Sequence, residues 1–263
     1  MASVQDFKRR IRSVRNTRKI TRALELVAAA KLRRAQARIE AMRPYADTMR
    51  ELISGVGRAA GSVQRLPLLQ QRDEISSTLI VPLTGDRGLA GAFNAQVTRR
   101  AFALERRLQS EGQTVRWLGV GKKGRSTLTF RRRTLDGAFV GFMDAPTYAD
   151  AQAIAHRAAE LFVEGEVDRV VLVYNTFVSA LTQTVTEQEI LERLLPVYLE
   201  TQVYRALLES GASFQGAQMT AMRNASKNAE ELIDRYTLQM NRARQAEITQ
   251  EILEVVAGAD ALS

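Results

Sequence analysis

Residues 4–43 read VQDFKRRIRSVRNTRKITRALELVAAAKLRRAQARIEAMR, and this stretch contains neither glycine nor proline. Its apolar residues recur at spacings of three and four, first at Val4, Phe7, Ile11 and Val14 and then at Ile20, Leu24 and Val27. An average spacing of 3.5 residues keeps one narrow seam of a helix facing a partner helix. The pattern predicts a helix to about residue 58, kinked locally at Pro44.

The C-terminal residues repeat this design. After Pro196, apolar residues recur at intervals of three, four or seven as far as Val256, and Gly258 is the expected helix stop. At 1.5 Å per residue, each terminal helix would be about 80–90 Å long. Two such helices at opposite ends of a chain, each with a seam, most simply pair as an antiparallel coiled coil. Many seam positions are alanine, which lets two backbones approach closely.

Between the terminal helices, strand patterns alternate with helix patterns. Strands are expected at 77–83, 114–120, 137–140 and 169–175, and helices at 94–111, 123–130 and 148–164. This alternation favours βαβ units and a small, mostly parallel sheet. Residues 182–190 alternate polar and apolar side chains, as in an antiparallel edge strand. The chain therefore divides into an N-terminal coiled-coil helix (1–58), a central α/β domain (59–194) and a C-terminal coiled-coil helix (195–263). The first and last segments would form one shaft.

The composition excludes several kinds of chemistry. The 263 residues include no cysteine and one histidine, so a disulfide framework, a thiolate metal site and a cysteine nucleophile are excluded. His156 has no metal-ligand pattern beside it and is expected to be a surface or boundary imidazole. No apolar run reaches the roughly 18–20 residues of a membrane span, and the first residues lack a signal-peptide pattern. The sequence predicts a soluble intracellular protein.

The net charge of +9 is concentrated at one end of the chain. Residues 1–58 hold 15 Lys and Arg against 5 Asp and Glu, whereas the remainder is nearly neutral. A basic helix of this kind suits either an acidic protein surface or nucleic acid, so a basic coiled-coil nucleic-acid-binding protein is the alternative hypothesis. The shorter runs at Arg99-Arg100 and Arg131-Arg132-Arg133 are expected to form a solvated face, since no aromatic residues are interleaved for base stacking.

One glycine-rich segment resembles a cofactor motif. Gly119-Val120-Gly121-Lys122-Lys123-Gly124 has the GxGxxG spacing of a dinucleotide site and follows an expected strand. Asp144 has roughly the spacing of a ribose-binding acid, but it lies in a loop-like stretch. The segment continues with Arg125-Ser126, which places arginine where a P-loop requires lysine. We therefore expect a βα turn that carries surface lysines, with no cofactor, metal or catalytic residue.

Four segments of the chain resemble the ATP synthase gamma subunit family, and they occur in the family's order. They are FKRRIRSVRNTRKITRALELVAAAKL (7–32), GDRGLAGAFN (85–94), AMRNASKNA (221–229) and NRARQAEITQEI (241–252). The resemblance implies a long coiled-coil shaft with a central Rossmann-like α/β domain. It also implies a non-catalytic central stalk of a rotary proton-translocating ATP synthase, which couples rotation of the membrane ring to ATP synthesis or hydrolysis.

The resemblance implies partners as well. They are the alpha and beta subunits of the head, the epsilon subunit and the c-subunit ring, and no nucleic acid is expected. The protein would be peripheral to the membrane, on the cytoplasmic face of a bacterial plasma membrane or on the matrix or stromal face in an organelle. By resemblance, the residues in contact with partners are Lys19, Arg22, Leu24, Arg244, Gln245, Thr249, Gln250, Val255, Val256 and Leu262.

The sequence also departs from the family pattern. A segment usually present near residues 190–195 is missing, which implies a smaller foot at the membrane ring. Phe214, Gly216 and Gln218 stand where the family tends to have glutamate, alanine and arginine. Gly211 and Gly216 would each cost about 0.5–1 kcal/mol relative to alanine in a regular helix. These differences would fit a divergent copy of the subunit.

Overall fold

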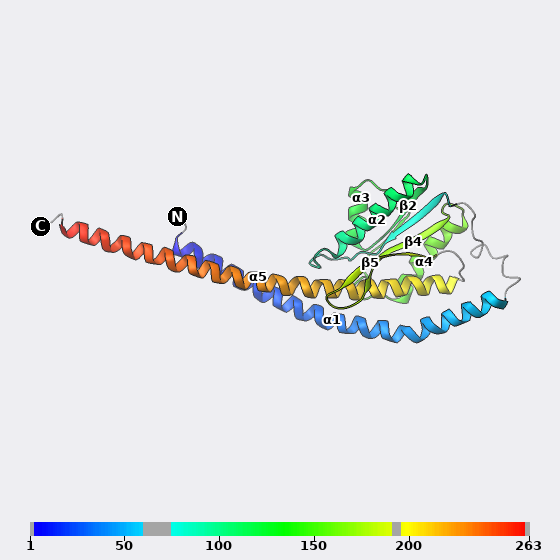
Figure 1. Cartoon of the computed structure of the whole chain (residues 1–263), viewed down its shortest axis with the longest axis horizontal. Coiled ribbons are helices and arrows are strands. Elements are labelled where there is room, and N and C mark those ends of the chain that lie inside the picture. The colour runs from blue at the N-terminus through cyan, green and yellow to red at the C-terminus, as the bar shows by residue number, and fades with distance from the viewer. Residues whose placement is uncertain (1–2, 60–74, 191–195, 261–263) are drawn as a thin grey trace. The chain divides into compact units, whose positions relative to one another are not determined.

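The computed structural model describes residues 3–59, 75–190 and 196–260 (Figure 1). The chain falls into two compact units, one made of residues 1–27 with 221–263 and the other of residues 28–220. Two long helices, α1 (Val4–Ala59) and α5 (Pro196–Asp260), contribute to both units. Each unit is built differently, the first from paired helices and the second around a sheet.

Both predicted terminal helices are present. At the start of α1, the Ser3 hydroxyl accepts a hydrogen bond from the Asp6 N–H, and the Asp6 carboxylate accepts from the Ser3 N–H. This reciprocal pair satisfies two of the amides that a helix start leaves free. The helix assignment continues through Pro44 in α1 and past Gly258 in α5, so the expected stop at Gly258 is wrong.

The first unit is an antiparallel pair of helices. Phe7 packs against Tyr236, with ring centroids 6.5 Å apart, and the Thr21 and Ser226 hydroxyl oxygens lie 2.7 Å apart. As the residue number rises along α1, the number of its partner on α5 falls, which defines the antiparallel direction. The predicted coiled coil is therefore confirmed.

The seam of this pair differs from the predicted one after Val14. The side chains of Ile20 and Val27 are 60% and 53% exposed, whereas Thr21 and Glu25 are buried. The heptad register set by Phe7, Ile11 and Val14 continues unbroken at positions 18, 21 and 25, and an apolar seam at Ile20 would interrupt it. Packing in one continuous register therefore buries polar residues and leaves two apolar residues outside.

The second unit contains a five-stranded sheet in the order β3-β2-β1-β4-β5. Four strands are parallel, namely β1 (Ser77–Pro82), β2 (Thr114–Val120), β3 (Gly137–Phe139) and β4 (Arg169–Phe177). The edge strand β5 (Gln183–Glu189) runs antiparallel to β4. All five were predicted, and the topology confirms a small, mostly parallel sheet.

Helices cover both faces of this sheet. Successive residues of a strand point to opposite faces, and β1 shows this directly. Ile80 packs with residues of α2 (Phe93–Ser110) and α3 (Lys122–Phe130), whereas Leu79 and Val81 pack with α4 (Tyr148–Val163) and the first turns of α5. The near-continuous apolar runs of β1 and β4 reflect this burial on both sides.

The two helical glycines of α5 differ in their surroundings. A Cβ at Gly216 would lie 3.2 Å from the Ala180 carbonyl oxygen and 3.2 Å from the Gln183 side-chain nitrogen. A Cβ at Gly211 would lie at ordinary contact distance, 3.5 Å from the Met143 carbonyl oxygen. Gly216 therefore permits the close approach of the loop between β4 and β5, and Gly211 has no comparable steric need.

We predict opposite outcomes for alanine at these positions. Gly211→Ala should raise the free energy of unfolding by about 0.5–1 kcal/mol, the helix propensity difference. Gly216→Ala should raise the free energy of unfolding by less than Gly211→Ala does, or should lower it, because the neighbouring loop must move to admit the methyl group. Urea denaturation of the full chain followed by circular dichroism measures both. Equal stabilisation by the two substitutions would contradict this assignment.

Candidate functional site

The GxGxxG turn connects β2 to α3, and its amide donors are already used within the chain. The Lys122 N–H donates to the Asp86 carboxylate at 2.9 Å, and the Gly124 N–H donates to the Thr84 hydroxyl at 2.7 Å. The Lys123 N–H donates to the Gly85 carbonyl at 3.2 Å. A dinucleotide site aims such donors at the pyrophosphate. Here the Asp86 carboxylate and the Thr84 hydroxyl accept the hydrogen bonds that a phosphate would accept in such a site.

The glycines of this turn serve internal packing. Gly121 has φ +84°, and a Cβ there would overlap the Thr84 carbonyl oxygen. A Cβ at Gly124 would lie 2.7 Å from the Thr84 hydroxyl oxygen. Asp144, the candidate ribose ligand, forms an ion pair with Lys31 at 3.0 Å. The glycine spacing therefore reflects the contact of this turn with the end of β1.

His156 belongs to a hydrogen-bonded group between α4 and α5. Its Nε2 lies 3.1 Å from a carboxylate oxygen of the buried Glu200, which also accepts a hydrogen bond from the Tyr148 hydroxyl at 2.7 Å. The imidazole remains 59% exposed, as expected of a boundary residue. Among residues 3–59, 75–190 and 196–260, no three His, Cys, Asp or Glu side chains gather in a way that could hold a metal ion.

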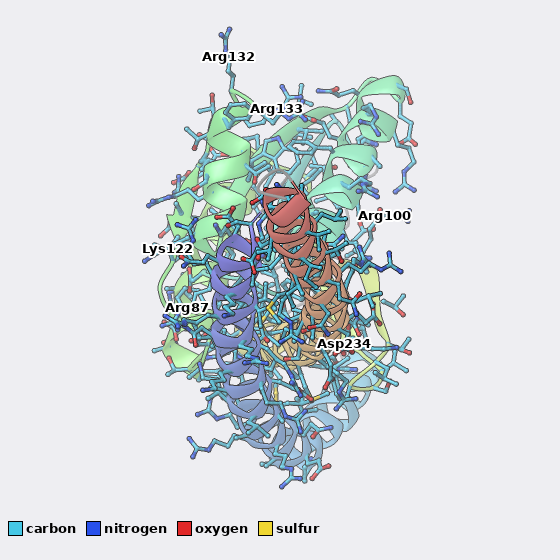
Figure 2. All side chains as sticks on the ribbon, turned by 90° about the vertical axis from the view of Figure 1, so that its left-hand side faces the viewer. Arg87, Arg100, Lys122, Arg132, Arg133 and Asp234 are labelled. Carbon is cyan, nitrogen blue, oxygen red and sulfur yellow. The ribbon has the colours of Figure 1, made fainter. Side chains whose placement is uncertain are left out.

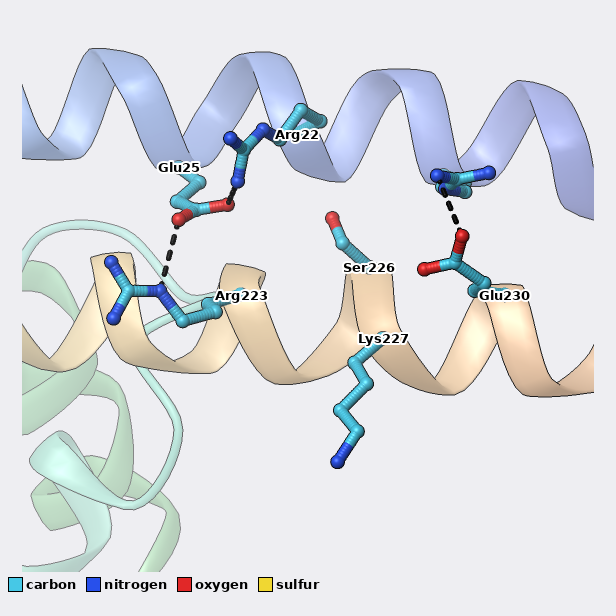
Figure 3. A pocket seen from close by; sticks show the side chains of 7 residues that line it. Arg22, Glu25, Arg223, Ser226, Lys227 and Glu230 are labelled. Atoms are coloured by element: carbon cyan, nitrogen blue, oxygen red, sulfur yellow. Dashed lines mark hydrogen bonds and ion pairs between the residues drawn. The ribbon is translucent and has the colours of Figure 1, made fainter.

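The first unit carries a polar cluster across its seam, formed by Arg18, Thr21, Arg22, Glu25, Arg223, Ser226 and Glu230. Figure 3 shows Arg22, Glu25, Arg223, Ser226 and Glu230 among them. The Glu25 carboxylate accepts from Arg22 on its own helix at 2.7 Å and from Arg223 on α5 at 3.0 Å. Arg18 pairs with Glu230 across the helices at 2.9 Å. All members of the cluster except Thr21, together with Lys227, line a groove of about 340 Å³. The cluster joins the two helices through three separate polar contacts.

Glu25 is the most buried charged member of this cluster. Its side chain is only 6% exposed. Burial by itself raises the pKa of Glu25, but the hydrogen bonds from Arg223 and Arg22 outweigh it and hold the pKa below its ordinary value of 4.5. The carboxylate is therefore charged at neutral pH, and both guanidinium groups stabilise that charge.

Polar groups in a coiled-coil seam specify register, because any shifted alignment leaves them buried without partners. Sliding α5 by one turn would separate Glu25 from Arg223 and Thr21 from Ser226 together. The polar cluster thus holds the two helices in one alignment and resists their sliding past each other.

The structure places three predicted contact residues beside the polar cluster. Arg22 belongs to it, Lys19 is exposed one residue after Arg18, and Leu24 is half-buried next to Glu25. Within the described residues, Lys19 has no ion-pair partner, whereas Arg22 is engaged by Glu25. These three residues therefore share a short stretch of α1.

The other predicted contact residues lie near the C-terminal end of α5. Every residue from Arg244 to Ala257 is exposed, including Gln245, Thr249 and Gln250. Val255 and Val256 are 72% and 52% exposed, and Leu262 lies outside the described residues. Ala243 is the last residue of this part of α5 that is partly buried. Figure 1 shows this end of α5 extending beyond the N-terminus of α1. The two groups of predicted residues are therefore separate.

Sequence reasoning missed most of the polar cluster. Thr21, Glu25, Arg223 and Glu230 were absent from the predicted contacts, because the search for a seam followed apolar residues only. The heptad register itself could have indicated which α1 residues lie at the seam. Extending it from Val14 by steps of four and three reaches positions 18, 21 and 25.

Comparisons with known proteins agree with this architecture. A sequence model of the family described as ATP synthase matches residues 3–191 and 184–262. The ATP synthase gamma chain of Rubrobacter xylanophilus is 43% identical over 100% of this chain and 99% of its own length. That of Moorella thermoacetica is 44% identical over the full length of both. The chain belongs to the ATP synthase gamma chain family.

Solved structures show the same fold. A chain of the central stalk and c-ring of the Tetrahymena thermophila mitochondrial ATP synthase matches with a TM-score of 0.64 and 29% identity, covering 79% of this chain and 99% of that one. A rotor chain of the Euglena gracilis mitochondrial ATP synthase matches with a TM-score of 0.69 and 17% identity, over 93% and 98% of the two chains.

Membership of the gamma chain family accounts for the results of the motif search. A gamma chain is a non-catalytic subunit, and the catalytic sites of the enzyme lie in the beta subunits. Nothing in the comparisons supports the alternative of a nucleic-acid-binding protein. In the described part of the chain, no helix is long and apolar enough to cross a membrane.

The buried Glu25 generates a pH-dependent prediction. Glu25→Gln should lower the free energy of unfolding by about 1–3 kcal/mol at pH 7, because it removes charged hydrogen bonds from a buried site. Since the folded-state pKa is lowered, this contribution is complete above the ordinary value of 4.5 and disappears as the pH falls through the folded-state pKa. The difference between the two proteins should therefore shrink in acid.

Thermal denaturation of both proteins at several pH values measures this difference. Glu231→Gln, at an exposed position of α5, is the matched control and should change stability little at any pH. A difference between the wild type and Glu25→Gln that stays constant down to about pH 2.5, well below the ordinary carboxyl pKa, would contradict the charged role of Glu25.

Proposed function

We propose that this chain is the central stalk of a rotary proton-translocating ATP synthase. It would couple ion-driven rotation of the membrane ring to ATP synthesis or hydrolysis at the alpha and beta subunits. The observation that carries the proposal is the 43% identity to a gamma chain along the whole sequence, and the antiparallel pairing of the two terminal helices is consistent with it.

The helix pair suits the transmission of torque. A single helix bends readily, whereas two helices packed along a seam and joined by side-chain contacts resist sliding and twisting. The polar cluster and the Phe7–Tyr236 contact fasten α1 to α5 at separate levels. Rotation applied to one helix would therefore be passed to the other.

The exposed end of α5 supports a contact with the head. Ile252, Leu253 and Val255 are each more than half exposed, yet isoleucine, leucine and valine are normally buried. Exposed apolar residues gathered on one segment are typical of an interaction surface. We propose that Val255, Val256 and Leu262 belong to a tip turning in an apolar bearing, and that Arg244, Gln245, Thr249 and Gln250 contact the upper head.

The basic stretch of α1 would face an acidic surface of the beta subunits. Residues 1–58 carry 15 basic and 5 acidic side chains, and Lys19 is exposed beside the polar cluster. Complementary charge favours both encounter and correct orientation of two protein surfaces. We assign Lys19, Arg22 and Leu24 to this contact.

The remaining partners would be the epsilon subunit and the c-subunit ring. The matched Tetrahymena structure is that of a central stalk with its c-ring. The protein would thus be peripheral to the membrane, held there through the complex. The cytoplasmic face of a bacterial plasma membrane, or the matrix or stromal face in an organelle, is the location that this role requires.

Co-expression with its own alpha and beta subunits tests the proposal. We expect a purified complex that contains this chain and hydrolyses ATP. Lys19→Glu should lower the ATPase activity of the complex several-fold, since it places a negative charge against an acidic surface. Lys122→Glu, an exposed lysine at the start of α3, is the matched control and should leave the activity near that of the wild type.

Two results would overturn different parts of this account. Recovery of the chain only as free protein would reject the assignment as a stalk. An active complex in which Lys19→Glu and Lys122→Glu behave alike would keep the stalk and reject the contact at Lys19.

A further inference from the structure

A groove between α2 and α3 gathers four arginines that the proposed rotor role does not use, three of them from the two arginine runs of the sequence. Arg99 and Arg106 come from α2, and Arg131 and Arg133 follow the end of α3. The groove has a volume of about 540 Å³. Arg132 extends outward near Arg133, whereas Arg100 lies apart from these two side chains (Figure 2). The fold therefore brings together charges that lie about 30 residues apart in the sequence.

This arginine groove, lined by Arg99, Arg106, Arg131 and Arg133, has an excess of positive charge. Arg133 pairs with Glu105. Within the described residues, Arg99, Arg106 and Arg131 have no ion-pair partner, although Arg100 and Arg107 on the same helix both pair with Glu187. Arg100 and Arg107 thus share one carboxylate, whereas Arg99, Arg106 and Arg131 of the groove are left available.

The one ion pair inside the groove shows which ligand geometry fits it. Arg133 approaches Glu105 through two nitrogens, Nε to Oε1 at 2.9 Å and Nη2 to Oε2 at 2.9 Å. This is the two-point pairing of a planar guanidinium with a carboxylate. All four cations of the groove are arginine, whose fork favours such pairing more than the point charge of lysine does.

We propose that the arginine groove binds an acidic helical segment of a partner protein. Arg99 and Arg106 are seven residues apart, or about 10.5 Å along α2 at 1.5 Å per residue. Carboxylates spaced by seven residues on a second helix lying along α2 would meet both guanidinium groups. Phe102 lines the groove between them and gives such a helix an apolar contact.

A neighbouring aromatic residue strengthens the choice of a protein partner. Phe130, the last residue of α3, is 84% exposed directly before Arg131. Exposed aromatic side chains beside arginines are the composition enriched at the centres of protein interfaces. Single-stranded nucleic acid would instead require a row of aromatic platforms between the cations.

Trp117 provides a natural reporter of binding. It is the only tryptophan of the chain, and its ring lies 5.6 Å from that of Phe102. It also lines an adjacent hollow of about 360 Å³ together with Arg132 and Arg133. A ligand in the groove should therefore change its fluorescence.

The test uses the full chain and a synthetic helical peptide of about 20 residues, a length at which isolated helices form. One face of the peptide carries glutamates three, four and seven residues apart, and a second peptide has glutamine at those positions. Binding is followed by Trp117 fluorescence. We expect the glutamate peptide to bind, with an affinity that falls as salt is raised, and the glutamine peptide to bind at least tenfold more weakly.

The groove variant is Arg99→Gln/Arg106→Gln/Arg131→Gln, which spares Arg133 because Glu105 depends on it. The control is Arg33→Gln/Arg34→Gln/Arg38→Gln, three exposed arginines of α1. Unchanged circular dichroism confirms that both variants are folded. The groove variant should bind the glutamate peptide at least tenfold more weakly, with the control unchanged. Equal loss in both variants would overturn the proposal, as would tighter binding of a single-stranded oligonucleotide or of phosphatidylserine vesicles.

Discussion

The pairing of Glu25 with Arg223 across two helices is the contact on which the first unit depends. A buried carboxylate is costly unless charged hydrogen bonds surround it, and here one comes from each helix. The arrangement favours one alignment of α1 and α5, because sliding would separate the buried charge from Arg223 and leave it only Arg22 of its own helix. A less polar seam could give more stability and less specificity.

The second unit is held together by a buried sheet rather than by a polar seam. Its sheet is buried on both faces, and its turns are closed by the chain's own polar groups rather than kept open for a ligand. Thr84 and Asp86 accept hydrogen bonds from amides of the glycine-rich turn, and Glu200 is hydrogen-bonded to His156. A fold shared with many nucleotide-binding proteins is here a structural body. Fold and function are separable in this way because function depends on particular groups at particular sites.

Much of this architecture could be predicted from the sequence. Long runs without glycine or proline, with apolar residues every three or four positions, specify paired helices almost without ambiguity. Strands β1 and β4 were predictable because buried parallel strands are near-continuous apolar runs, and β5 because an antiparallel edge strand alternates polar and apolar side chains. The detailed seam was not, since Ile20 is as apolar as Ile11 and only the continuous register excludes it. Gly258 failed as a stop because a glycine weakens a helix without ending it.

The candidate site could be predicted only in part. Family resemblance predicted partner contacts at Lys19 and near Val255, where the side chains are accessible, and these contacts stay predictions. It did not identify Glu25 or the grouping of Arg99 with Arg131. Both depend on which residues meet across elements distant in the sequence, and local pattern carries no information about that. Composition showed that positive charge was in excess, and the structure showed which of those charges are already paired.

A disulfide across the seam tests most directly the claim that α1 and α5 turn as one shaft. The chain has no cysteine, so Thr21→Cys/Ser226→Cys introduces a single pair at two hydroxyls now 2.7 Å apart. In a complex with the alpha and beta subunits, single-molecule rotation driven by ATP is recorded before and after oxidation. The account predicts that the disulfide forms under mild oxidation and that rotation continues at an unchanged rate. Failure of the bond to form, or rotation that stops when it forms, would contradict it.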